Sequence, residues 1–173
     1  MSNAVQRIPF RSGLRKVERD EGEVFDVAGA RITWKVKGEE TGYAFSICEQ
    51  RLEPGEGVLL HCHAYSEVFY VLSGVVEFLR VTDDGQEWVT CSAGETAIIP
   101  INAPHAFYNL TEQPARLLGI STHLHQVFFD AVVEADRAES FAEMPLHDAM
   151  ERIGALAQKF SMHFFPFEPP SRT

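Results

Sequence analysis

Cysteines are few in this 173-residue sequence, and their spacing matches no metal or disulfide motif. Cys48, Cys62 and Cys91 make an odd count, and no Cys-x-x-Cys pair occurs. Disulfide-stabilised extracellular folds carry an even set of cysteines, whereas thiols stay reduced in the cytosol. The sequence therefore predicts free thiols and a cytoplasmic location.

Long hydrophobic runs and a dominant basic charge are also missing. No apolar stretch approaches the roughly 18–20 residues that span a bilayer, and the N-terminus lacks the apolar stretch of a secretory signal. The chain has 15 Lys and Arg against 25 Asp and Glu, a formal net charge of −10. Non-specific nucleic-acid binding requires clustered cations that neutralise phosphates. The sequence therefore predicts neither a membrane nor a nucleic acid as partner.

What is present suits one domain rich in short strands. Hydrophobic residues make up 45% of the chain, which argues against disorder. Strand patterns separated by Gly, Pro and Asp turns follow one another between Val24 and Thr122. They are Arg31–Lys37, Gly42–Leu52, Val58–His63, Glu67–Leu72, Val75–Thr82, Glu87–Cys91, Thr96–Ile99, His105–Asn109 and Ala115–Thr122. Regular spacing of this kind predicts an all-β antiparallel sandwich or barrel.

The pattern changes from strand to helix at His123. Apolar residues recur at helical spacing from Leu124 to Ala135, and a second amphipathic segment runs from Leu146 to Phe160. Both helices are expected to pack on the barrel or to form a dimer interface. The chain then divides into an N-terminal extension (1–23), a β-barrel (24–122) and a C-terminal helical segment packed on the barrel (123–173).

Three of the seven histidines form a pattern with one glutamate. His61 and His63 are two residues apart on a predicted strand, so their side chains leave the same face, while Cys62 points the other way. Glu67 begins the next strand and His105 a later one, and a barrel can bring such distant strands together. Three imidazoles and one carboxylate suit one divalent transition-metal ion, namely Fe, Mn, Ni, Co, Cu or Zn.

The same residues lie in two segments that resemble the motifs of the cupin superfamily. The first motif, G-x5-H-x-H-x3-E-x6-G, is matched by Gly55, His61, His63, Glu67 and Gly74. The second, G-x5-P-x-G-x2-H-x3-N, is matched by Gly94, Pro100, His105 and Asn109. Asn102 stands where the second motif has glycine. Because Asn tolerates the left-handed backbone better than most residues, we expect this turn to be preserved.

The resemblance, which covers residues 24–122, implies the double-stranded β-helix of the cupins, a jelly-roll barrel, with two short helices outside it. It also implies that His61, His63, Glu67 and His105 are the metal ligands. The chain is similar, more specifically, to small bacterial cupins related to quercetin dioxygenases. That similarity lies in Thr41–Tyr43, Leu52–Gly55, Tyr70–Gly74, Val127–Phe129 and Ser161–Phe164.

The resemblance implies a metal-dependent, dioxygenase-like enzyme acting on a small aromatic or enolisable organic substrate. Two alternatives stay open: a non-oxidative isomerase or lyase with the metal as Lewis acid, and a small-molecule-binding protein without turnover. Glu67 would be either a static ligand or also the catalytic base that takes a substrate proton. Cupin relatives commonly pair, and a partner would cover edge strands, so we expect a homodimer.

Residues that share strand parity with the ligands are expected to line an apolar substrate pocket, with plain core packing as the alternative for each. They are Leu59, Phe69, Val71 and Phe107. Either Arg80 or Arg116 would favour an anionic substrate if it faced inward. The histidines outside both motifs are interpreted as non-ligands; they are His123, His125, His147 and His163.

Overall fold

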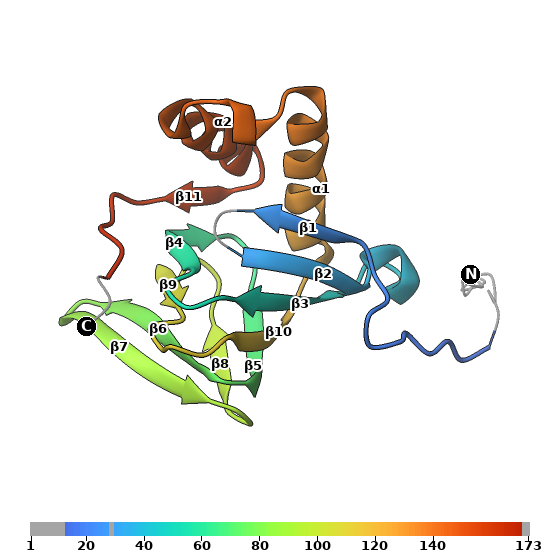
Figure 1. Ribbon diagram of the computed structural model, residues 1–173, viewed down its shortest axis with the longest axis horizontal. Coiled ribbons are helices and arrows are strands. Elements are labelled where there is room, and N and C mark those ends of the chain that lie inside the picture. Colours follow the sequence, from blue (N-terminus) through green and yellow to red (C-terminus); the bar gives the residue numbers. More distant parts are fainter. Residues whose placement is uncertain (1–12, 28–29, 171–173) are drawn as a thin grey trace, which may run out of the picture.

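Strands dominate the computed structural model of this protein, which describes residues 13–27 and 30–170 (Figure 1). The strands are β1 (Val24–Val27), β2 (Ala30–Val36), β3 (Ser46–Leu52), β4 (Gly57–His63), β5 (Glu67–Ser73), β6 (Val75–Thr82), β7 (Gly85–Ser92), β8 (Thr96–Ile99), β9 (His105–Tyr108), β10 (Ala115–Ser121) and β11 (Met162–Phe164). The helices are α1 (His123–Ala138) and α2 (Leu146–Lys159), with short 3₁₀ turns at Gly38–Thr41 and Phe141–Glu143.

The strands form two antiparallel sheets that face each other across the core. One sheet has the order β1-β2-β3-β10-β5-β8 and the other β11-β4-β9-β6-β7. Neighbouring strands are often distant in sequence, as where β10 lies between β3 and β5. The all-β jelly-roll with two C-terminal helices, predicted from the sequence, is confirmed.

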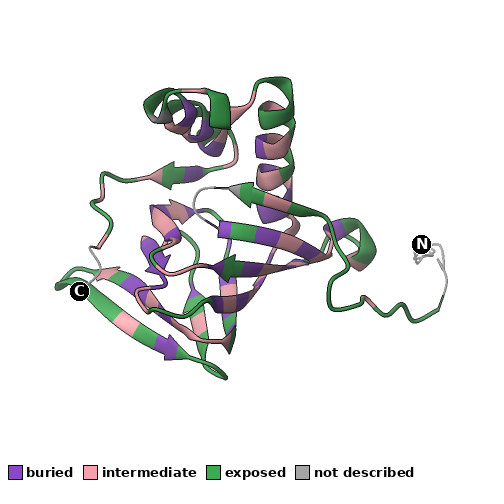
Figure 2. Ribbon diagram, in the orientation of Figure 1, coloured by how far each residue is buried: buried purple, intermediate pink, exposed green. Residues whose placement is uncertain are grey.

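Buried and more exposed residues alternate along the strands, and the buried ones form the core between the sheets. In β10, every second residue from Ala115 to Ser121 is buried, and the residues between them are partly exposed (Figure 2). Phe69, Phe78 and Phe107 meet at the centre with ring centroids 5.0–5.7 Å apart. These rings come from β5, β6 and β9, so the aromatic cluster holds the two sheets together.

Several element boundaries differ from those predicted. The strand expected over Gly42–Leu52 begins only at Ser46, because Gly42 and Tyr43 both adopt positive φ after the Gly38–Thr41 turn. β1 and β11 were not anticipated. Asn102 has a φ of 61°, so the turn expected there is preserved, and its N–H donates to the His63 carbonyl at 2.8 Å.

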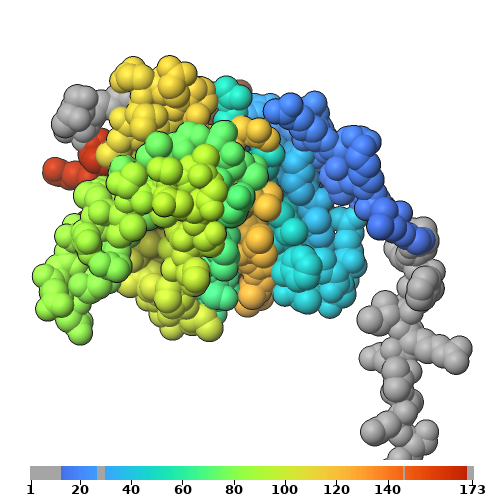
Figure 3. All heavy atoms as spheres, turned by 90° about the horizontal axis from the view of Figure 1, so that it is seen from below, coloured from blue at the N-terminus to red at the C-terminus, as the bar shows by residue number. Residues whose placement is uncertain are grey.

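The C-terminal segment covers one end of the barrel. The α-helices and β11 lie together at the top of Figure 1, whereas strands and their loops make up the face seen from below in Figure 3. Phe128 and Val132 of α1, Ile153 of α2 and Met162 of β11 pack into one buried cluster with Tyr65. In the described part of the chain, no helix is long and apolar enough to cross a membrane.

Candidate metal centre

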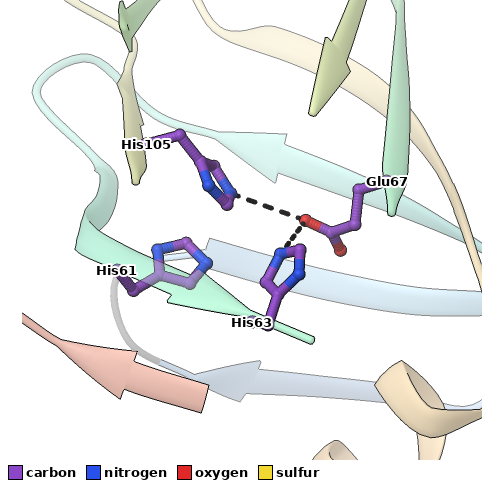
Figure 4. A group of neighbouring side chains, drawn as sticks. All are labelled: His61, His63, Glu67 and His105. Carbon is purple, nitrogen blue, oxygen red and sulfur yellow. Dashed lines mark hydrogen bonds and ion pairs between the residues drawn. The ribbon is translucent and has the colours of Figure 1, made fainter. Parts of the chain in front are cut away.

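Four buried side chains from three strands meet inside the barrel. β4 supplies His61 and His63, β5 supplies Glu67 at its first residue, and β9 supplies His105 at its first residue. Their exposed fractions are 5% or less, and their potential ligand atoms all lie within 4.8 Å of one another (Figure 4). The structure thus brings together the four residues that the motifs singled out.

Strand pairing explains this convergence. β4 and β9 are hydrogen-bonded neighbours, and His61 lies directly opposite His105 in their register. The two-residue spacing places His63 on the same inward face as His61. Glu67 comes from the opposite sheet, where β5 starts after a short turn at residues 64–66. The cluster therefore spans the two sheets.

Backbone carbonyls select the tautomer of each histidine in the cluster. Nδ1 of His61 lies 2.8 Å from the Leu59 carbonyl oxygen, and Nδ1 of His63 lies 2.7 Å from that of Tyr65. Nδ1 of His105 is 2.9 Å from the Ala103 oxygen. A carbonyl oxygen only accepts, so each Nδ1 carries the proton and each neutral ring keeps a lone pair on Nε2. Three imidazole lone pairs are thereby available to a cation.

The arrangement of these acceptors fits a metal ion. Nε2 of His63 lies 3.0 Å and Nε2 of His105 lies 3.6 Å from the same Glu67 oxygen, Oε2. The buried His105 Nε2 has no hydrogen-bond partner among the described residues. Lone pairs facing a carboxylate are unfavourable unless a proton or a cation lies between them. Ligands at about 2.1 Å from one ion lie at most about 4.2 Å apart, so a small contraction of the cluster suffices.

The pKa shifts of His61 and Glu67 favour the protonation states that a metal requires. Burial and the neighbouring His105 lower the pKa of His61 to about 3. Burial alone would raise the pKa of Glu67, but His125, His105 and His63 outweigh it and hold that pKa well below its ordinary value. Metal ligation needs neutral imidazoles and ionised carboxylates. Glu67 therefore presents a full negative charge to the site.

His125 is a further residue of the site that sequence reasoning did not place there. It lies in the first turn of α1, is 5% exposed, and its Nε2 is 3.1 Å from Oε1 of Glu67. His125 lies outside the four-residue group that could hold a metal ion. That it is not a ligand stays a prediction. A signal existed: His125 precedes Phe128, Phe129 and Val132 at the i+3, i+4 and i+7 positions of the apolar helix face.

A cavity of about 40 Å³ adjoins the cluster between the barrel and the C-terminal segment. Its polar lining consists of Gln50, His61, Glu67 and His125. The apolar lining residues are Ala30, Ile32, Val58, Phe69, Phe107, Phe128, Phe129, Ile153, Met162 and Phe164. The cluster therefore lies next to a cavity with a mostly apolar lining.

Two of the four predicted pocket residues line this cavity and two do not. Phe69 and Phe107 lie on it, but Leu59 and Val71 do not. The β4–β9 register shifts between Val58 and His61, so strand parity counted back from His61 fails and Val58 takes the place expected for Leu59. Val71 is fully buried within the barrel core.

Neither of the two arginines left open by the sequence reaches the cavity. Arg80 is exposed and pairs with Glu87 on the neighbouring strand β7. Arg116 pairs through Nε with Glu49 at 2.7 Å on the outer side of its sheet. The structure provides no cationic group among the cavity-lining residues that would favour an anionic substrate.

Comparison with known proteins identifies the type of domain. Residues 48–121 match the family model of the cupin domain. The search of curated proteins finds no match. Among solved structures, the polyketide cyclase RemF from Streptomyces resistomycificus is 22% identical with a TM-score of 0.56, over 64% of this chain and 80% of the cyclase.

Oxalate decarboxylases are similar over a smaller part of their length. The Lactobacillus farciminis enzyme, in its formate complex, is 18% identical with a TM-score of 0.51, over 58% of this chain. A tryptophan-to-phenylalanine variant of the Bacillus subtilis enzyme is 19% identical with a TM-score of 0.54, over 65% of this chain. The match spans 30% of each decarboxylase. Mn(II) centres are described for the Bacillus enzyme.

The fold and the buried cluster define a β-barrel protein with a centre suited to a metal. Residues 48–121, less than half of the chain, match the cupin domain model, so this part of the chain is similar to a cupin domain. The identities to solved structures are too low to show more than the fold. They do not single out the quercetin dioxygenase-like group, which stays a prediction.

Proposed function

We propose that this protein binds one divalent transition-metal ion through His61, His63, Glu67 and His105. The proposal is supported by the three Nε2 lone pairs that face the Glu67 carboxylate inside a buried cluster. Fe, Mn, Ni, Co, Cu and Zn all accept this donor set. Four protein ligands leave positions of an octahedral ion open to water or substrate.

We further propose that the protein is a metal-dependent, dioxygenase-like enzyme acting on a small organic substrate. The observation that carries this proposal is the apolar cavity next to the cluster. When bound, the metal would supply a redox-active or Lewis-acidic centre for the substrate and dioxygen. Phe69, Phe107 and Val58 line the cavity, and with a substrate bound they would limit the access of bulk water, which strengthens electrostatic interactions there.

Polar groups of the cavity would orient the substrate. Gln50 is 3% exposed, lines the cavity, and its Oε1 has no hydrogen-bond partner among the described residues. A buried amide oxygen of this kind is satisfied when a substrate hydroxyl donates to it. Glu67 would accept a proton from an enolisable or phenolic substrate, as well as binding the metal.

Non-oxidative isomerase or lyase chemistry is the second candidate. It is supported by the contact between the Glu67 carboxylate and the His125 ring, 3.1 Å apart at the edge of the cavity. A carboxylate and an imidazole in contact can hold and return a substrate proton without an oxidant.

The deciding experiment loads metal-free protein separately with Fe, Mn, Ni and Co. Oxygen uptake and product formation are then followed, with and without oxygen, on small catechols, β-diketones and flavonols. Metal-dependent uptake that is lost in Glu67→Gln supports the dioxygenase. Turnover under anaerobic conditions supports an isomerase or lyase. Binding of a test compound without turnover, for every combination of metal and compound, identifies a binding protein.

The remaining proposals concern the setting of the molecule. We propose a homodimer, supported by the exposed Ile98 on β8 and Ile101 beside it, at the edge of the larger sheet. A cytoplasmic location is supported by the three free thiols. We also propose that the chain divides into an N-terminal extension (1–23), a β-barrel (24–122) and a C-terminal helical segment packed on the barrel (123–173).

A further inference from the structure

The two oxygens of Glu67 have different surroundings. Oε2 faces the histidine cluster, 3.0 Å from His63 and 3.6 Å from His105. Oε1 points away from that pair and lies 3.1 Å from Nε2 of His125 on α1. An ionised carboxylate only accepts hydrogen bonds, so the proton in this contact belongs to His125 Nε2.

Aromatic rings surround His125 and leave Glu67 as its polar partner. Trp34, Tyr65 and Phe129 have ring centroids 6.1, 5.7 and 4.7 Å from the His125 ring. Among hydrogen bonds and ion pairs of the described residues, the contact with Glu67 is the one that His125 side-chain atoms make. A buried polar contact in apolar surroundings is strong, because no water competes for it.

The next residue of α1 holds the start of the helix against the barrel. Oε1 of Gln126 accepts the Gly38 N–H at 2.6 Å in a buried position. Nε2 of Gln126 also donates to Asp130 and Glu39 at 3.2 Å. Gln126 therefore ties the first turn of α1, which also carries His125, to the Gly38–Thr41 turn.

We propose that His125 is a positioning residue for the metal centre, holding Oε1 so that Glu67 binds the ion through Oε2 alone. This inference rests on the proposed metal site. A carboxylate with both oxygens free can chelate one ion with both, which would occupy a further coordination position. By engaging Oε1, His125 leaves that position for substrate or water. The barrel thus supplies the ligands, and the helical segment sets how one of them binds.

The test compares three substitutions at position 125 with Mn(II) and Co(II) as the probes. His125→Gln retains an N–H near the position of Nε2. His125→Asn is polar but one methylene shorter, and His125→Phe keeps the ring but removes the donor. We expect Asn and Phe to weaken metal affinity about 10–100-fold, as loss of an outer hydrogen bond to a ligand does. His125→Gln is expected to retain most of the wild-type metal affinity, because its side-chain N–H can still donate to Glu67.

The visible absorption of bound Co(II) is a second readout, independent of activity. It reports coordination geometry, so we expect it to change in the Asn and Phe variants and to return toward wild type in Gln. Leu124→Ala is the matched control, because Leu124 lies in the same first turn of α1, is 52% exposed and does not line the cavity. This control should bind metal as the wild type does.

Three results would overturn the inference or its basis. Wild-type affinity and an unchanged Co(II) spectrum in both Asn and Phe variants would refute the role of His125 and leave the metal site intact. Weakening by Gln and Asn, with wild-type affinity in Phe, would assign the effect to ring packing and refute the hydrogen-bonding role. Failure of wild-type protein to bind either ion would refute the proposed site itself. Thermal unfolding of each metal-free variant separates these results from misfolding.

Discussion

At the scale of the residue, the proton on each ligand histidine decides what the cluster can bind. A carbonyl oxygen at Nδ1 of His61, His63 and His105 leaves the three Nε2 atoms as lone-pair donors. Were the tautomers reversed, N–H groups would face the interior and repel a cation. The chemistry of the centre therefore depends on main-chain atoms as much as on the ligand side chains.

Removing two of these lone pairs should remove the metal. We expect the double variant His61→Ala, His63→Ala to lose stoichiometric metal, because two ligands are insufficient for tight binding in a buried site. Elemental analysis of purified protein measures this directly. His163→Ala is the control, since His163 is exposed on β11 and outside the cluster. Full metal content in the double variant would contradict the assignment.

The metal-free protein should lose stability as the pH falls. The folded-state pKa of His61 is lowered to about 3, against 6.5 for an ordinary histidine. Between these values the unfolded chain binds a proton that the folded chain does not, so stability is retained above pH 6.5 and declines below it. The loss is about 1.4 kcal/mol per pH unit for this one group. Urea unfolding at pH 7, 6 and 5 measures it, and a flat profile would contradict the shift.

The spacing of His61 and His63 was enough to predict their common face, and the motif residues led to His105 and Glu67. His125 could not be found in this way, because its approach to Glu67 depends on how α1 docks on the barrel. Val58 replaced Leu59 at the cavity because a register shift changes strand parity. Local spacing therefore predicts a residue's face only while the strand stays regular.

At the scale of the element, β4 is the strand on which the site depends. It carries two of the proposed ligands, His61 and His63, and lies between β9 and β11, so it is paired on both sides. β11 has three residues and no alternating pattern long enough to indicate a strand from sequence. Its pairing arises because the chain after α2 returns to the ligand strand. The nine strand patterns from β2 to β10 were predictable, whereas β1 and the return of β11 to β4 were not.

Close packing of β4 against β9 can be tested at Gly57. A Cβ at this position would lie 2.3 Å from the Phe107 carbonyl oxygen, which belongs to the backbone and cannot move aside cheaply. We expect Gly57→Ala to destabilise the fold by about 1–3 kcal/mol and to weaken metal binding by displacing His61. Chemical unfolding and metal titration measure the two effects.

Gly154→Ala is the matched control for that substitution. Nothing lies within 4 Å of a Cβ at Gly154, which is inside α2. Alanine in a helix interior is favoured over glycine by about 0.5–1 kcal/mol. The control should therefore be more stable than the wild type, with metal binding unchanged. Equal stability losses in both variants would show that Gly57 is not specially constrained.

At the scale of the whole molecule, exposed apolar side chains at one sheet edge favour a second copy as partner. Ile98 is 71% and Ile101 is 59% exposed, although both are large aliphatic residues. We expect a solution mass of about twice 19.4 kDa by light scattering, and a shift toward the monomer in Ile98→Asp. Glu139→Ala, at an exposed site after α1, is the control. A concentration-independent monomer mass in the wild type would refute the dimer.

The hydrogen bonds between β11 and β4 join residues 162–164 to the strand that carries two residues of the candidate metal centre. Met162 lies opposite His63, and Phe164 lies opposite His61. If the ion binds more tightly when β11 is docked, β11 must dock more firmly when the ion is bound, and by the same factor. Amide hydrogen exchange at residues 162–164 would then slow on addition of metal. Hydrogen exchange in β11 would then report whether the metal site is occupied, and the measurement needs no substrate.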